Sequence, residues 1–149
     1  HTSVAMDKEK VAGEIRDRLA DSKVENTEVS VDDEGVTVSI EDIRFLPDSS
    51  ELIPSEIEKL KVIAEILTGY PDRDFLITGH TAMAGTAEGR QALSEERAKA
   101  VGNYLLRLGA GDAGQIVTKG MGGRKPIADN STEEGMRRNR RVEITILEN

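Results

Sequence analysis

Segment 74–100 carries the residues with the clearest chemical potential in this chain, two arginines and a histidine close together in sequence. Arg97 falls on the apolar stripe of a predicted helix, and that stripe comprises Leu93, Val101, Tyr104 and Leu108. A guanidinium on a core-facing stripe is costly unless it pairs with an acid or lies at the rim of a cleft. Arg97 therefore either awaits an anionic ligand or serves an internal carboxylate.

The sequence lacks a complete set of catalytic residues. His80 stands beside Thr81, and Ser94 is the nearest suggestive hydroxyl, but no third group completes a set of nucleophile, base and orienting residue. We expect His80 to be a structural histidine that hydrogen-bonds loop backbone at a strand end. Adjacent carboxylates such as Glu95–Glu96 are typical of solvated surface, and one internal histidine makes no recognisable zinc site. The sequence predicts a protein that is not an enzyme and uses no metal or cofactor.

The composition opposes several other classes of protein. A net charge of -8 disfavours binding to nucleic-acid phosphates, and an aromatic share of 3% disfavours base-stacking or lectin-like surfaces. The absence of cysteine excludes disulfides and thiolate sites. No apolar run reaches the roughly 20 residues of a membrane span, and no signal peptide is present. Because the chain begins at His1, we interpret it as a fragment or a trimmed mature protein whose membrane tether lies outside it.

The elements that position these residues follow from hydrophobic periodicity. An amphipathic helix is expected over residues 5–20, and strands 27–31 and 36–40 alternate at period two around a turn that ends at Gly35. Ile43 and Phe45 are expected to extend the second of these strands. A second helix is expected over 56–68, with Ser55 as its N-cap and Glu58 as the capping-box partner.

The second half of the chain continues the alternation of strand and helix. A strand at 75–77 leads through a small-residue loop into the helix that carries Arg97. Residues 109–114 match G-x-G-x-x-G, but they end a helix and precede a strand, so we interpret them as a helix C-cap and loop. A mobile loop is expected at 120–126, and a last strand at 142–146 completes a terminal hairpin-like pair. The order predicts an α+β two-layer sandwich with helices on one face of a mixed sheet.

Three segments together resemble a known family. The first is Phe45 with its polar loop and helix, and the second combines the GHT of 79–81 with the LSxxRA of 93–98. The third is the NRRV of 139–142, preceded by Gly122, Pro126, Asn130 and Gly135. Their order and spacing resemble the OmpA-like (OmpA/Pal/MotB C-terminal) peptidoglycan-associating domain. The resemblance divides the chain into a helix-and-strand extension, 1–35, and an OmpA-like domain, 36–149.

The resemblance implies a βαβαββ sandwich in the periplasm, associated with the outer membrane, that grips the peptide stem of peptidoglycan non-covalently. In the family the ligand group is meso-diaminopimelate, and the arginine of LSxxRA, here Arg97, holds a ligand carboxylate. The resemblance further implies that the loop after Phe45 supplies backbone donors and cavity wall. The ligand-binding set is then completed by Thr81, Ala82, Arg90, Leu93, Arg140, and the loop residues Leu46, Pro47 and Asp48. For Arg137, Arg138 and Arg141 we favour structural ion pairs or a solvated turn, and envelope proteins are possible partners.

The site departs from the family pattern in its charge. The family reads GHTD, with the Asp engaging the ligand's ammonium, whereas this chain reads GHTA with Ala82 in that place. Where the family commonly has Asn, the chain has Arg90, two helical turns before Arg97. Two hypotheses follow. In the first, the domain binds a stem peptide whose diamino acid differs from meso-diaminopimelate or whose amine is not recognised by the protein. In the second, the domain is a structural or protein-interaction module that has lost wall binding, and Arg90 pairs with Glu88, Glu95 or Asp48.

Overall fold

The computed structural model describes residues 5–47 and 49–148 and contains one five-stranded sheet. The elements in chain order are α1 (Lys8–Asp21), β1 (Thr27–Val31), β2 (Gly35–Glu41), α2 (Pro54–Leu67), β3 (Phe75–His80), α3 (Ala87–Arg107), the 3₁₀ turn η1 (Ala113–Gln115), β4 (Ile116–Gly120), α4 (Glu133–Asn139) and β5 (Arg141–Leu147). The strand order is β1-β2-β5-β3-β4, in which β3 and β4 are parallel and the other neighbours antiparallel. The expected α+β sandwich is confirmed.

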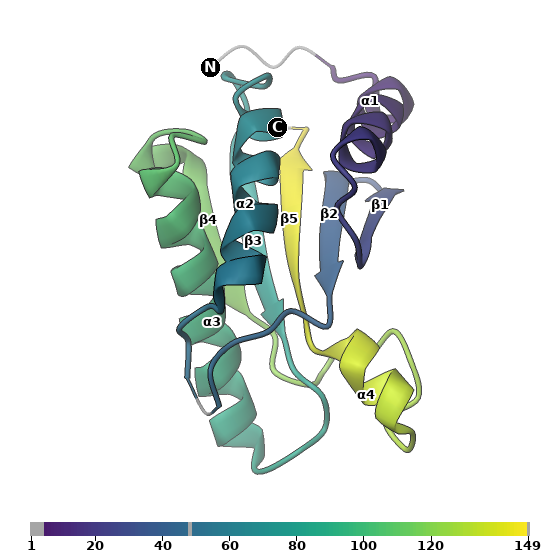
Figure 1. Ribbon diagram of the computed structural model, residues 1–149, viewed down its shortest axis with the longest axis vertical. Helices are drawn as coiled ribbons and strands as arrows, with labels where there is room; N and C mark the ends of the chain where they lie inside the picture. The colour runs from purple at the N-terminus through teal and green to yellow at the C-terminus, as the bar shows by residue number, and fades with distance from the viewer. Residues whose placement is uncertain (1–4, 48, 149) are drawn as a thin grey trace.

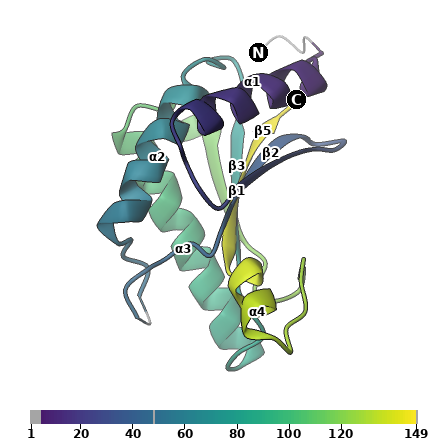
Figure 2. The same cartoon turned by 45° about the vertical axis from the view of Figure 1, so that its right-hand side comes forward.

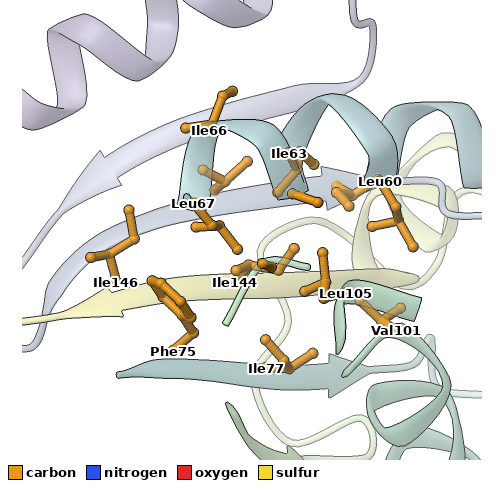
Figure 3. Packing of buried hydrophobic residues seen from close by; sticks show 14 of the residues in the cluster. Leu60, Ile63, Ile66, Leu67, Phe75, Ile77, Val101, Leu105, Ile144 and Ile146 are labelled. Carbon is orange, nitrogen blue, oxygen red and sulfur yellow. The ribbon is translucent and has the colours of Figure 1, made fainter. Parts of the chain in front are cut away.

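Helices α1, α2 and α3 cover one face of the sheet (Figures 1 and 2). Strand residues of alternate positions point to that face, since side chains reverse direction at every residue of a strand. Figure 3 shows Phe75 and Ile77 of β3 and Ile144 and Ile146 of β5 packing beneath Leu60, Ile63 and Leu67 of α2. Polar side chains such as Thr37, Glu143 and Thr145 lie on the opposite face, which no long helix of the described residues covers (Figure 2). Among the described residues, no helix is both long and apolar enough to cross a membrane.

The N-terminal elements belong to the same core. Val11, Ala12, Ile15 and Leu19 of α1 are buried in the cluster that also contains the β5 isoleucines. Strand β1 extends the sheet through antiparallel pairing with β2, from Thr27 opposite Ile40 to Val31 opposite Val36. The periodicity of 5–20 and 27–31 therefore predicted elements that the core uses.

The loops that follow β2 and β3 lie at the same end of the sheet as α4, whereas α1 and the end of β5 lie at the other (Figure 1). Strand β2 ends at Glu41, and Asp42 adopts a left-handed φ of 52°, so the predicted extension through Ile43 and Phe45 is wrong. Phe45 instead forms an isolated bridge with Leu52. The resulting loop turns back toward α3.

Three further predictions about elements are corrected. Helix α2 begins at Pro54 with Ile53 as N-cap, so Ser55 lies inside the first turn because proline at the first helical position already has the required φ. The predicted terminal hairpin-like pair is wrong, since β5 inserts between β2 and β3 and does not pair with β4. The polar stretch before β5 contains α4, a helix that was not predicted from the sequence.

The apolar stripe of α3 is displaced by one position from the predicted one. Its buried residues are Ser94, Ala98, Val101, Gly102 and Leu105, whereas Leu93, Arg97 and Tyr104 are only partly buried. Arg97 therefore lies at the border of the core, where its stem is covered and its guanidinium reaches toward the loops. Gly109, after the helix end, has a φ of 79°, which confirms a C-cap rather than a nucleotide-binding loop.

Candidate functional site

A pocket of about 180 Å³ lies between the loop after β3 and the first turns of α3. Six of the predicted ligand residues line it together: Thr81, Ala82, Arg90, Leu93, Arg97 and Arg140. They come from two regions far apart in sequence: residues 81–97, which contain the loop after β3 and the first half of α3, and Arg140, which lies between α4 and β5. The sheet order explains this meeting, because β3 and β5 are neighbours and Arg141 lies opposite His80.

The floor of the pocket is held by close packing of α3 on the strand ends. A Cβ at Gly79 would lie 2.2 Å from the carbonyl oxygen of Ser94, so only glycine allows this approach. The fully buried Ser94 hydroxyl accepts the N–H of Gly122 at 2.9 Å, and the carbonyl of Gly122 accepts the N–H of Thr81 at 2.9 Å. The Ser94 hydroxyl thus positions Thr81 at the pocket and has a structural role.

Arg97 is oriented by the loop after β2. Its Nε donates to the carbonyl oxygen of Ser49 at 3.2 Å, and its guanidinium carbon lies 4.5 Å from the centroid of the Phe45 ring. A guanidinium stacked on an aromatic face keeps its other N–H groups in the plane, where they suit a carboxylate. Leu46 and Pro47 of the same loop are exposed and lie outside the pocket lining, and Asp48 is outside the described residues.

Arg90 bridges α3 and the small-residue loop. Its Nη1 donates to the carbonyl oxygen of Gly85 at 2.7 Å, and Gly85 adopts a φ of 73° that presents this carbonyl. No ion pair joins Arg90 to Glu88 or Glu95, within the part of the chain that the structure describes. The third expected partner of Arg90, Asp48, lies outside the described residues.

The electrostatics of the pocket are one-sided. Its lining contains the guanidiniums of Arg90, Arg97 and Arg140, and no acidic side chain among its described members. Ala82, 5% exposed, places a methyl group where a carboxylate would balance this charge. Thr81 lines the pocket, and its buried hydroxyl has no hydrogen-bond partner among the described residues. The arrangement can hold an anion and one polar group.

Four lining residues were not predicted: Ala84, Gly85, Thr86 and Gly89. They form the turn into α3, whose N-cap is Thr86 with its hydroxyl accepting the N–H of Gly89 at 3.0 Å. A threonine before a helical pattern is an N-cap signal, and it could have located this wall of the pocket.

His80 lies on the other face of the sheet from Ser94, so the two cannot form a catalytic pair. Gly79 faces α3, and the next side chain points away from it. The predicted bonding of His80 to loop backbone is wrong: the ring, 6% exposed, has its Nε2 3.4 Å from Oε1 of Glu143 and makes no backbone hydrogen bond among the described residues. Arg141 donates to Oε2 of the same carboxylate at 2.9 Å.

The remaining arginines near β5 have structural surroundings. Arg138 pairs with Glu41 at 3.1 Å, Arg141 pairs with Glu143, and Arg137 is exposed. The ion pairs favoured for Arg138 and Arg141 are thus present. The described residues contain no group of three or more His, Asp or Glu that could hold a metal ion.

Comparison with known proteins places the chain among cell-envelope proteins. The model of the OmpA family matches residues 44–140. The peptidoglycan-binding protein ArfA of Mycobacterium tuberculosis is 43% identical over 105 residues, covering 70% of this chain and 32% of ArfA. The peptidoglycan-associated lipoprotein of Pseudomonas aeruginosa is 38% identical over 115 residues, covering 77% of this chain and 67% of the lipoprotein.

A solved structure, the cell wall anchor of the T6SS from Pseudomonas aeruginosa, has the same fold. It superimposes with a TM-score of 0.74 at 30% identity, covering 88% of this chain and 94% of the anchor. The chain spans about a third of the length of ArfA.

Proposed function

Because the chain belongs to the OmpA family, we propose that it binds the peptide stem of peptidoglycan non-covalently and so anchors an envelope component to the cell wall. The names of ArfA and the Pseudomonas lipoprotein support this proposal, since both refer to peptidoglycan. The protein would act in the periplasm, associated with the outer membrane through a tether outside this chain. The OmpA-like domain would comprise residues 36–149 and the extension residues 1–35.

The observation that carries the proposal is the prepared Arg97. Its guanidinium is stacked on Phe45 and anchored to Ser49 beside an open pocket. A ligand carboxylate would meet a donor whose orientation is already fixed, which lowers the entropic cost of binding. Leu93 would contact the aliphatic part of the ligand, and Thr81, whose hydroxyl has no partner among the described residues, would offer a polar group. Leu46, Pro47 and Asp48 would contribute the outer wall.

We further propose that the pocket recognises a diamino acid differently from a site that reads both a carboxylate and an ammonium. Ala82 offers no countercharge, and Arg90 adds a cation to the same lining. Two unit charges about 5 Å apart interact by about 3 kcal/mol at an effective dielectric of ~20, before screening by solvent. A ligand ammonium inside the pocket is therefore repelled by the arginines. A ligand whose amine is acylated or points out of the pocket is favoured. Arg90 would supply a second carboxylate contact.

The proposal is tested by calorimetric titration with soluble stem peptides. The series carries meso-diaminopimelate, its ε-N-acetyl derivative, lysine and ornithine at the third position. The acetylated peptide should bind more tightly than free meso-diaminopimelate, roughly tenfold for each 1.4 kcal/mol of relieved repulsion. Equal or tighter binding of the free diamine would show that Ala82 and Arg90 do not set specificity.

A matched pair of variants checks the role of Arg97. Arg107 lies on the same helix and also stacks on an aromatic ring, with its guanidinium carbon 5.0 Å from the Tyr104 centroid, but it is outside the pocket. Arg97→Ala should abolish measurable binding, whereas Arg107→Ala should bind as the wild type does. If the wild type binds neither stem peptides nor whole sacculi, the domain is an interaction module that has lost wall binding.

A further inference from the structure

Ala82 lies between two tethers that fix the pocket loop. On one side, the N–H of Thr81 donates to the carbonyl oxygen of Gly122 at 2.9 Å. On the other side, the N–H of Met83 donates to Oδ1 of Asn130 at 3.4 Å. Of these two, only the second depends on a side chain, and Asn130 itself is not part of the pocket lining. It can therefore be removed without changing a residue that would touch the ligand.

Asn130 is itself held in place by Asn139 of α4. The Asn139 side chain is fully buried, and its Nδ2 donates to Oδ1 of Asn130 at 2.8 Å. The same side chain accepts the N–H groups of Ile127 and Ala128 at 2.7 Å and 3.0 Å and donates to the carbonyl of Ala128 at 2.9 Å. Asn139 thus fixes the whole 127–130 turn, including the oxygen that faces Met83.

The support behind this asparagine pair is closely packed. A Cβ at Gly135 would lie 1.7 Å from the carbonyl oxygen of Asp129, so α4 rests directly on the turn that contains Asn130. Arg141, which is buried, donates to the carbonyl oxygens of Lys125 and Asn139 at 2.8 Å and 3.3 Å. The segment from Lys125 to Asn130 is therefore a rigid part of the fold, and the pocket loop is attached to it.

We propose that Asn130 is a positioning residue for the ligand pocket. By holding the Met83 N–H, it sets the backbone of Ala82 and hence the wall that faces Arg90 and Arg97. Two hydrogen bonds connect Asn139 to the pocket loop, one from Asn139 to Asn130 and one from Met83 to Asn130. The bond from Met83 is the longer of the two, so it is the more easily broken. The effect on ligand affinity rests on the proposed function, whereas the effect on loop order does not.

The test compares three variants of the full chain by two measurements. Asn130→Ala removes the acceptor, and Asn130→Asp keeps an oxygen at the same position. Ser131→Ala is the neighbouring control, since among the described residues Ser131 Oγ bonds only within its own turn, to Asp129 Oδ1 at 2.7 Å. Amide hydrogen exchange of Met83 in the free protein should accelerate at least about fivefold in Asn130→Ala. It should remain near the wild-type rate in Asn130→Asp and Ser131→Ala.

The second measurement is affinity for the stem peptide that the wild type binds best. Loss of one neutral hydrogen bond corresponds to roughly two- to tenfold weaker binding by Asn130→Ala. Thermal stability should also fall in Asn130→Ala, because the buried Asn139 Nδ2 loses an acceptor, whereas Asn130→Asp keeps an oxygen for both bonds. Unchanged exchange of Met83, or unchanged affinity in spite of faster exchange, overturns the inference. A wild type without affinity for any stem peptide instead overturns the proposed function, and the exchange rates then decide whether Asn130 orders the loop.

Discussion

The guanidinium of Arg97 is fixed by the protein before a ligand binds, and the same is true of Arg90. Arg97 has the Phe45 ring and the Ser49 carbonyl, and Arg90 has the Gly85 carbonyl. Preorganised donors lose little side-chain entropy on binding. We propose that the lack of an acidic side chain at Ala82, rather than the strength of the anion contact, sets the specificity of this pocket.

Ala82→Asp should restore recognition of an ammonium. The new carboxylate would lie in the pocket that Arg90 and Arg97 share, and it would attract the amine of a meso-diaminopimelate peptide. We expect the affinity for that peptide to rise by roughly tenfold or more, and the preference for the ε-N-acetyl peptide to disappear. Ala92→Asp, exposed on α3 and outside the pocket lining, is the matched control and should leave selectivity unchanged.

Glu143 makes the stability of the protein depend on acid pH. Burial opposes its ionisation, but the His80 ring and the Arg141 guanidinium outweigh burial and lower the pKa of this carboxyl from 4.5 to about 2. Because the folded-state pKa is below the unfolded one, the ionised group stabilises the fold above pH ~4.5, and this contribution is lost as the pH falls toward 2. Urea unfolding of the wild type and Glu143→Gln should therefore differ at pH 6 and converge near pH 2. A constant difference across this range would contradict the assignment.

At the scale of elements, glycines determine how closely helices approach their neighbours. In Gly135→Ala the added methyl would lie 1.7 Å from the carbonyl oxygen of Asp129, and an alanine methyl cannot rotate away from this clash. We expect a loss of about 3 kcal/mol or more in the free energy of unfolding, because backbone must shift. Gly13→Ala, in the middle of α1 with nothing within 4 Å of the added methyl, should instead stabilise the protein by roughly 0.5–1 kcal/mol. Denaturant titration measures both.

The elements themselves were largely predictable, because periodicity reports the buried face directly. The sites of error are those where a competing local rule or a distant contact decided the outcome. Pro54 occupies the first position of α2, so the helix begins before Ser55. The left-handed φ of Asp42 ends β2 before Phe45. The carboxylate beside His80 is set by the pairing of β3 with β5, which no local pattern in either strand reveals.

The candidate site was predicted through motif spacing rather than through periodicity. Arg97 and Arg140 line one pocket, as the resemblance implied, and Arg90 lines it too, as its spacing of two helical turns from Arg97 indicated. The turn at 84–86 was missed because Ala84 and Gly85 carry no chemical signal of their own and the N-cap signal of Thr86 marks a helix start, not a binding site. The role of Asn130 could not be read from the sequence, since its oxygen reaches Met83 across 47 residues of chain.

At the scale of the whole molecule, α1 is part of the core although it lies outside the residues that match the family. Ile15→Ala should therefore destabilise the entire protein by roughly 2–5 kcal/mol, since Ile15 is fully buried. Asp17→Ala, on the exposed side of the same helix, should change stability little. A single shifted transition by circular dichroism is expected. A separate early transition confined to α1 would show that the extension folds independently.

The position of β5 between β2 and β3 also has a kinetic consequence. Strand β5 pairs with β2 on one side, where Val36 lies opposite Ile146, and with β3 on the other. The centre of the sheet is therefore incomplete until residues 141–147 have been added. Bringing β2 and β5 together closes a long loop, which costs entropy before any contact between the strands forms. Chains dominated by pairings between distant segments fold in about milliseconds to seconds. A ribosome-bound chain that lacks β5 would present two unpaired strand edges at its centre. The pairs β1-β2 and β3-β4 therefore cannot be joined into one sheet until β5 has been synthesised and has paired with both β2 and β3.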